Sequence, residues 1–233
     1  MPAPGGAAWA VVVAGGEGRR FGRAKQFEPL GDRLVVEWSV QTARLVVDEV
    51  VLVLPPEALD DERRRAGCVH VTAGGTTRAD SVRAGLALVP GDVAYVLVHD
   101  AARPLASPAL FAAVLDAVRA GADGAIPGLA MTDTVKRVRD GRVTETLDRR
   151  ELVAVQTPQA FRAEALRRAH AGAPEATDDA GLLEAIGAEV VVVPGEPRNL
   201  KITELDDLAR LARWAAEAHH LPPASEPAAL EQR

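Results

Sequence analysis

The 233-residue chain carries 27 basic and 33 acidic side chains, which gives a formal net charge of −6. No overall basic field therefore favours nucleic acid, and no apolar run approaches the roughly 18 residues of a membrane-spanning helix. The first residues lack the basic and apolar regions of a signal peptide, and the one cysteine, Cys68, excludes an internal disulfide. We therefore expect a cytoplasmic protein that binds neither nucleic acid nor membrane, with one folded domain over residues 1–218 and a disordered tail over 219–233.

The residues from Trp9 to Phe27 form an apolar run followed by a loop rich in glycine and arginine. Val11, Val12 and Val13 are consecutive and β-branched, which is typical of a parallel strand covered on both faces. Glycines allow backbone N–H groups to turn toward an anion, and basic side chains add charge. The sequence therefore predicts a phosphate-binding loop at the carboxyl end of the first strand, where open α/β sheets bind ligands. The loop glycines are Gly15, Gly16, Gly18 and Gly22, and its basic residues are Arg19, Arg20, Arg23 and Lys25.

Two better-known glycine-rich loops do not fit this spacing. A Walker loop has Gly-Lys followed by Ser or Thr, whereas Lys25 lies between Ala24 and Gln26. A dinucleotide fingerprint has G-x-G-x-x-G at the start of a helix and an acid after the second strand, but here that strand runs into Pro55 and Pro56. A dehydrogenase is therefore disfavoured, while a glycine-rich connector with solvated arginines stays an alternative for this segment alone.

Strands and helices alternate along the first half of the chain. This alternation predicts an α/β fold with a Rossmann-like, doubly wound and mostly parallel sheet. After the first strand, the patterns predict strands over 49–54, 69–73, 95–99 and 124–127, and helices over 34–44, 56–66, 77–88 and from 108 onward.

A second glycine-rich loop precedes the predicted helix at Thr77. Thr77 and Asp80 have the capping-box spacing, so the helix begins there, and Arg78 and Ser81 can both point toward the loop face. A helix start that needs only its cap is the alternative.

Asp100 and Arg103 directly follow the predicted strand 95–99. An acid followed by an arginine that Pro104 stiffens suits contact with a hydroxyl or Mg²⁺ on one side and a phosphate on the other. A local salt bridge in the turn is the alternative.

The second half begins with a predicted hairpin. Short β-rich runs over 134–138 and 142–146 flank Asp140-Gly141, a strong turn signal. A charged two-stranded ribbon is marginal alone, so we expect this arm, about residues 131–152, to lie against a second subunit. The remaining elements are a strand over 153–155, a helix ending at 171, a helix capped at 177–179 that ends at 186, a strand over 189–193, a short strand over 200–202, and a helix to about 218 that follows a capping box at 203–206.

Only three of the 27 basic residues are lysines: Lys25, Lys136 and Lys201. An ammonium is a compact charge that can approach one phosphate oxygen where a flat guanidinium cannot. A lysine in this arginine-rich chain therefore suggests a chemical requirement, and a chance remnant of the composition is the alternative.

Seven motifs in chain order resemble one family, the 2-C-methyl-D-erythritol 4-phosphate cytidylyltransferases of the non-mevalonate isoprenoid pathway. They extend from Ala14 to Thr203 and are AGGEGRRFGRAKQF, GGTTRADSVRAGL, HDAARP, DTVKRV, QTPQAF, TDDAGLLEAIG and NLKIT. Each motif is moderately specific, and the ordered set is strongly so.

The resemblance implies a nucleotidyltransferase that uses CTP, a methylerythritol phosphate and Mg²⁺ or another divalent cation, and that forms a homodimer through the arm. Thr134 and Arg149 would reach in from the second subunit, and Asp100 would lie near a metal held mainly by the CTP phosphates. Nucleotide binding is implied for Ala14, Gly15, Gly16, Gly18, Gly75, Thr76, Arg78, Ser81, Asp100 and Ala101. Substrate binding is implied for Asp100, Arg103, Thr134, Arg149, Thr157 and Lys201, and a catalytic role for Arg20, Lys25, Arg149 and Lys201.

Three positions depart from the family pattern: Val13 replaces a frequent proline, Gly15 a usual alanine, and Thr76 an acid that commonly contacts the base. Loss of that acceptor would relax the choice of base. Related cytidylyltransferases that act on ribitol 5-phosphate are the closest alternative, and a non-catalytic nucleotide-binding regulator on the same fold is a distant one. The reaction itself needs no general base, because a phosphate monoester is already ionised at neutral pH.

Overall fold

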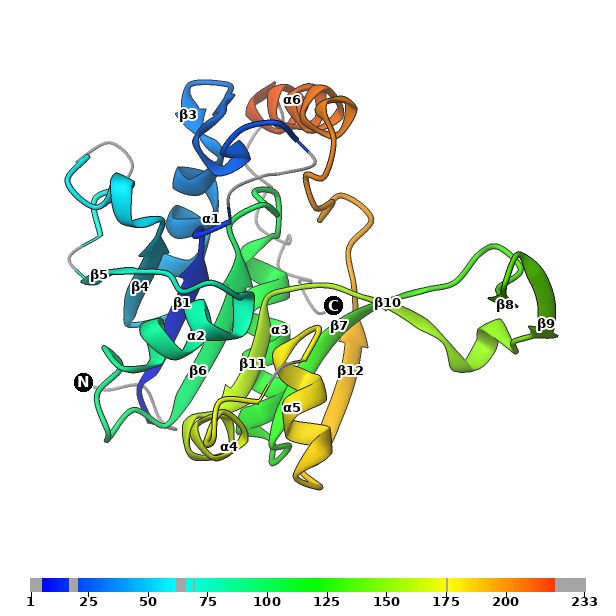
Figure 1. The fold of residues 1–233 in the computed structure, drawn as a ribbon. Helices are drawn as coiled ribbons and strands as arrows, with labels where there is room; N and C mark the ends of the chain where they lie inside the picture. The colour runs from blue at the N-terminus through cyan, green and yellow to red at the C-terminus, as the bar shows by residue number, and fades with distance from the viewer. Residues whose placement is uncertain (1–5, 17–20, 62–65, 69, 175, 221–233) are drawn as a thin grey trace, which may run out of the picture.

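The computed structural model describes residues 6–16, 21–61, 66–68, 70–174 and 176–220. Its main sheet has the order β10-β7-β11-β6-β1-β4-β5, and β12 pairs with β7 (Figure 1). These strands are β1 (Ala8–Val13), β4 (Glu49–Leu54), β5 (His70–Ala73), β6 (Tyr95–Asp100), β7 (Gly124–Ala130), β10 (Val153–Val155), β11 (Gln159–Arg162) and β12 (Val190–Pro194). The α-helices are α1 (Val35–Arg44), α2 (Arg78–Leu86), α3 (Pro108–Arg119), α4 (Ala163–Ala169), α5 (Asp179–Ala185) and α6 (Leu205–His220).

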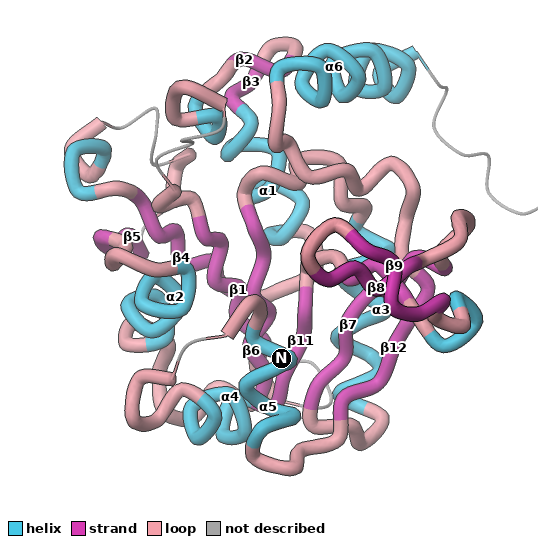
Figure 2. The backbone as a smooth tube through the Cα atoms, turned by 45° about the vertical axis from the view of Figure 1, so that its right-hand side comes forward, coloured by secondary structure: helices cyan, strands magenta, loops and turns pink. Residues whose placement is uncertain are grey.

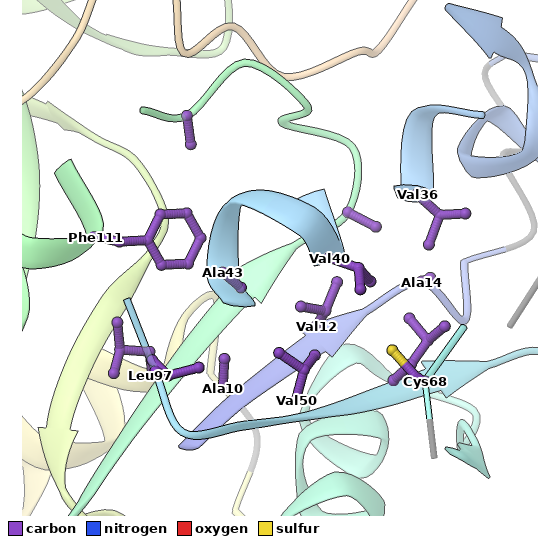
Figure 3. Close-up of a cluster of buried hydrophobic side chains, with 14 of the residues drawn as sticks. Ala10, Val12, Ala14, Val36, Val40, Ala43, Val50, Cys68, Leu97 and Phe111 are labelled. Atoms are coloured by element: carbon purple, nitrogen blue, oxygen red, sulfur yellow. The ribbon is translucent and has the colours of Figure 1, made fainter. Parts of the chain in front are cut away.

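Strand β1 lies between β4 and β6 and runs parallel to both. Successive side chains of a strand point to opposite faces, so a central strand must be apolar throughout. Val12 accordingly belongs to one cluster with Val40 of α1 and Phe111 of α3, and Val40 lies next to it in Figure 3. Val11 packs on the other face with α2, α4 and α5. The expected doubly wound, mostly parallel α/β sheet is confirmed.

The short hairpin of β2 (Pro29–Leu30) and β3 (Arg33–Leu34) packs beside α6 (Figure 1 and Figure 2). Ile202 is fully buried in the same cluster, together with Leu211 of α6. Asp207 secures the helix start, because its Oδ2 accepts from the backbone N–H groups of Thr203 and Glu204. These contacts hold the segment before α6 in place, and the acid that caps α6 is Asp207 rather than the predicted Asp206.

Helix α2 lies close to the sheet because residue 85 is glycine. A Cβ at Gly85 would lie 2.4 Å from Val11 Cγ1 and 3.0 Å from Val53 Cγ2. The predicted capping box is present, since Thr77 Oγ1 accepts from the Asp80 N–H and the Asp80 carboxylate accepts from the Thr77 N–H. The start of α2 is thereby fixed beside the carboxyl ends of the central strands.

The predicted arm is present as β8 (Lys136–Arg139) and β9 (Arg142–Thr146), which pair antiparallel and lie away from the main sheet in Figure 1. Asp140 and Gly141 form the turn with φ values of 49° and 74°, the left-handed values that a two-residue hairpin turn requires. Val138 and Val143 of this hairpin are 54% and 62% exposed. The arm thus presents apolar surface that the described part of its own chain leaves exposed.

Two predicted elements differ from the structure, and the sheet contains one strand that was not predicted. The helix expected over 56–66 is a single 3₁₀ turn, η2 (Pro56–Ala58), in the described part of that range, and Ala66 has a left-handed φ of 50°. No strand forms at 200–202. Strand β11, which runs antiparallel between β6 and β7, was not predicted. None of the helices in the described ranges has the length and apolar character needed to cross a membrane.

Candidate active site

A pocket of about 410 Å³ opens where the loops after β1, β5 and β6 meet. Loops at this edge of a parallel sheet are the expected position for a ligand site. The pocket brings together most of the site residues predicted from distant parts of the sequence. Its lining residues are Val13, Ala14, Gly15, Gly16, Lys25, Gln26, Gly75, Thr76, Thr77, Arg78, Ser81, Asp100, Ala101, Ala102 and Lys201.

The glycine loop after β1 is held by Gln26, a residue that the sequence did not single out. The Gln26 amide is 3% exposed, and its Nε2 donates to the carbonyl oxygens of Ala14 at 2.7 Å and Gly16 at 3.0 Å. These bonds turn the carbonyls of the loop toward the protein. Gln26 lies directly after Lys25, so it also anchors the chain at the lysine of the pocket.

The second glycine loop forms the opposite wall with the start of α2. Ser81 Oγ accepts from the Gly75 N–H at 3.2 Å and donates to the Thr77 carbonyl at 3.1 Å. A Cβ at Gly74 would lie 2.8 Å from this oxygen, so glycine permits the close approach. Thr76 Oγ1 donates to Asp80 Oδ2 at 2.9 Å. The Thr76 side chain therefore lines the pocket with its hydroxyl directed at a carboxylate of α2, the helix that follows it.

Asp100 is the charged centre of the pocket. Arg78 Nε donates to its Oδ1 at 2.9 Å, and Lys201 Nζ donates to its Oδ2 at 2.5 Å. Burial alone would raise the pKa of Asp100, but the Arg78 and Lys201 charges outweigh burial and hold that pKa well below its usual range. The carboxylate is therefore ionised and bridges α2 to the segment before α6.

The two pocket lysines are attached to the same segment. Lys25 Nζ donates to the Ile202 carbonyl at 2.5 Å, while Lys201 itself pairs with Asp100. The side chain of Lys201 is 38% exposed. The fold thus brings two of the three lysines of the chain into one cavity, from positions 176 residues apart (201 minus 25).

Arg78 has a second carboxylate partner that the sequence reasoning missed. Its Nη1 donates to Asp179 Oδ2 at 2.8 Å, and Asp179 Oδ1 lies 3.0 Å from His170 Nε2. Burial lowers the pKa of Arg78, but the charges of Asp100 and Asp179 more than offset this and raise it above its ordinary value. The available sequence signal was the double acid Asp178-Asp179, since only one of the two is needed as a helix cap.

Thr157 and Arg103 lie behind the pocket lining. Thr157 Oγ1 accepts from the Asp100 N–H at 3.0 Å and lies 3.2 Å from His99 Nδ1. Arg103 Nη1 donates to the Asn199 carbonyl at 2.8 Å, and burial lowers the pKa of Arg103. Burial also lowers the pKa of His99 to about 4, so the imidazole is neutral near pH 7. The hydrogen bonds of Thr157 and Arg103 thus hold the turn after β6 in place on the side away from the pocket lining.

Besides Thr157 and Arg103, four further predicted site residues are not placed in this pocket. Gly18 and Arg20 lie outside the described residues. Thr134 and Arg149 lie on the exposed arm, where Arg149 Nη1 donates to the Thr132 carbonyl. Neither arm residue lines the pocket of its own chain.

A sequence model of the family described as "IspD: 2-C-methyl-D-erythritol 4-phosphate cytidylyltransferase" matches residues 8–216. This match covers the sheet, the pocket and the arm. The chain belongs to this family. The resemblance drawn from the seven motifs is therefore confirmed.

Curated relatives of this cytidylyltransferase family include proteins of two lengths. A 2-C-methyl-D-erythritol 4-phosphate cytidylyltransferase of Rhodococcus jostii is 47% identical over 218 residues, covering 91% of this chain and 96% of the relative. A "Bifunctional enzyme IspD/IspF" of Nitratidesulfovibrio vulgaris is 45% identical over 224 residues, covering 87% of this chain. The chain spans only 57% of the length of that bifunctional relative.

Solved structures of the family have the same fold. The Thermus thermophilus 2-C-methyl-D-erythritol 4-phosphate cytidylyltransferase superposes with a TM-score of 0.76 at 34% identity, covering 88% of this chain and 98% of that one. The 4-diphosphocytidyl-2C-methyl-D-erythritol synthase of Anaerococcus prevotii gives 0.80 at 30% identity, covering 91% and 99%. The cytidylyltransferase fold is thus shared over nearly the whole length of these neighbours.

Proposed function

We propose that this protein transfers CMP from CTP to 2-C-methyl-D-erythritol 4-phosphate, giving 4-diphosphocytidyl-2-C-methyl-D-erythritol and pyrophosphate. Membership of the family supports this reaction. The observation that carries it is the convergence of Lys25 and Lys201 on a pocket walled by two glycine-rich loops. Compact cations beside exposed backbone N–H groups suit a polyphosphate ligand.

The proposed chemistry asks the protein for position and charge rather than for a base. An ionised phosphate oxygen of the sugar phosphate forms a bond to the α-phosphorus of CTP, and the bond from that phosphorus to the β-phosphate bridging oxygen breaks. Lys25 and Lys201 would offset the negative charge that gathers on the reacting phosphates. Each ammonium would first leave its present acceptor, the Ile202 carbonyl for Lys25 and Asp100 for Lys201.

The other pocket residues take roles consistent with their positions. Ala14, Gly15 and Gly16 would wrap the nucleotide, and Gly75, Arg78 and Ser81 would shape the pocket for its base. Asp100 and Ala101 would lie near the ribose. All of these residues line the same cavity.

Mg²⁺ would enter this site as part of a metal–nucleotide complex. Among the described residues no group of three or more His, Cys, Asp or Glu side chains could hold a metal ion, and Asp100 is the single carboxylate on the pocket lining. Both Asp100 oxygens already accept from cations. A metal held mainly by the CTP phosphates, with Asp100 nearby, therefore fits these residues, and it would supply further charge to the phosphoryl groups.

The arm is proposed to complete the site in a homodimer. Arg149 and Thr134 are exposed and lie outside the pocket of their own chain, while Val138 and Val143 present apolar surface. A two-fold dimer in which each arm lies over the partner's pocket would cover these valines and bring Arg149 to the sugar phosphate, beside Arg103 and Thr157. Placement in the cytoplasm stays a prediction.

The test is pyrophosphate release from CTP with a panel of sugar and polyol phosphates. We expect release only with a divalent cation present and fastest with 2-C-methyl-D-erythritol 4-phosphate. Faster turnover of ribitol 5-phosphate would assign the chain to the alternative substrate. Absence of release with every acceptor, in a protein that still binds CTP, would support the non-catalytic regulator.

A further inference from the structure

Asp179 is a buried carboxylate to which the cytidylyl-transfer scheme above gives no role. It is the first residue of α5, and its side chain is 1% exposed. Asp178, the residue before it, already caps this helix, because its Oδ1 accepts from the Gly181 N–H at 3.1 Å. A carboxylate is rarely buried without a strong partner, and capping does not account for Asp179.

The partners of Asp179 connect it to the pocket. The guanidinium of Arg78 lies between two carboxylates, with Nη1 on Asp179 and Nε on Asp100. These carboxylates come from the start of α5 and the end of β6. On its other oxygen, Asp179 contacts His170, whose side chain is 3% exposed. A continuous chain of charged groups thus extends from Lys201 in the pocket to the interior beneath α5.

Lys201 and Asp179 differ in whether a ligand can reach them. Lys201 is 38% exposed and reaches Asp100 from the open side of the pocket, so an incoming phosphate can draw it away. Asp179 is 1% exposed and does not line the pocket, so its bond to Arg78 need not break when a ligand enters. Without Asp179, Arg78 would depend on Asp100 alone, at the moment when Asp100 loses Lys201.

His170 orients this carboxylate. A carboxylate only accepts hydrogen bonds, so His170 Nε2 carries the proton and donates to Asp179 Oδ1. His170 Nδ1 is buried and has no hydrogen-bond partner among the described residues. Its single hydrogen bond in that set therefore goes to Asp179 and fixes one carboxylate oxygen, which leaves the other aimed at Arg78.

We propose that Asp179, oriented by His170, is a positioning residue that fixes the Arg78 guanidinium at the wall of the nucleotide pocket while Lys201 exchanges Asp100 for a phosphate. This inference rests on the proposed function and deepens it. If the buried pair served only to join α2, α4 and α5, its loss would lower the melting temperature without a specific effect on CTP.

The test compares two neighbouring acids by measuring CTP binding calorimetrically in the presence of Mg²⁺. Asp179→Asn removes the charge opposite Arg78, whereas Asp178→Asn removes the same charge one residue away and retains a good helix cap. Gln159 Nε2 donates to Asp178 Oδ2 in the wild type, and a turn of the Gln159 amide would let its Oε1, which has no partner among the described residues, accept from the amide introduced at position 178. We expect the dissociation constant for CTP to rise about tenfold for Asp179→Asn and less than twofold for Asp178→Asn.

A double-mutant cycle establishes whether the effect passes through Arg78. In an Arg78→Lys background, Asp179→Asn should weaken CTP binding less than twofold, because the guanidinium that Asp179 orients is already gone. A tenfold loss in that background would overturn the inference, as would equal CTP binding by Asp179→Asn and the wild type.

His170 variants keep the inference testable if Asp179→Asn does not fold. His170→Gln retains a donor near the Nε2 position and should bind CTP almost as the wild type does, while His170→Ala should bind it several-fold more weakly. Equal CTP binding by the two His170 variants would contradict the orienting role. Failure of the wild-type protein to bind CTP would instead refute the proposed function.

Discussion

Lysine is rare in this chain, and the contact that Lys25 makes suits a compact ammonium. Its ammonium fits between the glycine loop and the Ile202 carbonyl, a contact with one oxygen that suits a compact donor. In the proposed reaction the same ammonium would meet negative charge that develops on the phosphates. Its contribution should therefore appear in the transition state more than in the binding of CTP.

We expect Lys25→Ala to lower kcat about a hundredfold, the equivalent of about 3 kcal/mol, because one charge-assisted contact to a developing charge is lost. Steady-state kinetics with varied CTP measures kcat and KM separately. Lys25→Arg serves as the matched variant, since it keeps the charge and should recover part of the rate. A normal kcat with a raised KM for CTP would assign Lys25 to ground-state binding alone.

Thr76 offers a test of how the base is read. Its hydroxyl donates to Asp80, so it presents no carboxylate acceptor to an exocyclic amine in the pocket. We expect Thr76→Asp to raise the preference for CTP over UTP, measured as the ratio of their kcat/KM values, by about tenfold. Thr76→Asn, which matches aspartate in size without its charge, should raise the ratio less. An unchanged ratio in Thr76→Asp would show that position 76 does not read the base.

The sequence predicted those pocket residues that belong to a recognisable local motif. Glycines, capping residues and acids that follow a strand identified Gly75, Arg78, Ser81 and Asp100 before any contact was known, and these residues line one pocket. Gln26 carries no such signal, and Asp179 carries only the doubled acid Asp178-Asp179, which does not identify its partner. Their importance comes from partners 12 and 101 positions away in sequence, and only the folded chain reveals those contacts.

At the scale of the element, the approach of α2 to the sheet determines where the second pocket wall lies. Gly85→Ala would place a methyl group 2.4 Å from Val11 Cγ1, on a strand held by neighbours on both sides. Overpacking costs about 1–3 kcal/mol and outweighs the gain of about 1 kcal/mol in helix propensity. We expect a net loss of up to about 2 kcal/mol in the free energy of unfolding.

Urea denaturation measures this loss, and Gly91→Ala is the matched control. No atom lies within 4 Å of a Cβ built at Gly91, and its φ is not in the left-handed region, so its free energy of unfolding should change by less than about 0.5 kcal/mol. Equal stability of Gly85→Ala and the wild type would mean that α2 can move off the sheet at little cost.

Helices and strands were predictable where the local sequence has a clear hydrophobic pattern. They were less predictable where tertiary contacts determine whether a segment forms a strand. The β-branched core of β4 was predicted with its observed bounds, 49–54. Strand β11 is short and follows Pro158, and it becomes a strand because β6 and β7 offer free edges on both sides. The segment at 200–202 forms no strand, and its Ile202 N–H donates to the Ala102 carbonyl outside any ladder. The local sequence does not indicate that β11 pairs with β6 and β7 or that Ile202 bonds to Ala102.

At the scale of the whole molecule, contacts within the described chain do not account for the exposed surface of the arm. It is charged, its valines are exposed, and Arg149 lies on it rather than in the pocket of its own chain. The fold class and the hairpin were predictable from periodicity and from Asp140-Gly141. The expected contact of the arm with a second subunit stays a prediction, because a single chain does not show which copy of the pocket the arm serves.

Mixed dimers can determine whether Arg149 serves the pocket of its own chain or that of the partner. Arg149→Ala and Lys25→Ala should each be nearly inactive as pure proteins. If the arms are exchanged, a dimer of one mutant with the other has one site that collects both defects and one site that collects neither. Random reassociation of equal amounts makes about half of the dimers mixed, so about a quarter of all sites are intact.

We therefore expect about a quarter of the wild-type activity after the two mutants are unfolded together and reannealed in equal amounts. The wild type, unfolded and reannealed alone, calibrates the recovery, and each mutant reannealed with itself gives the background. If Arg149 instead acts in its own subunit, every site in the mixture carries one defect or the other. Activity that stays at the background level, in mixtures that contain the heterodimer, would then exclude the shared site.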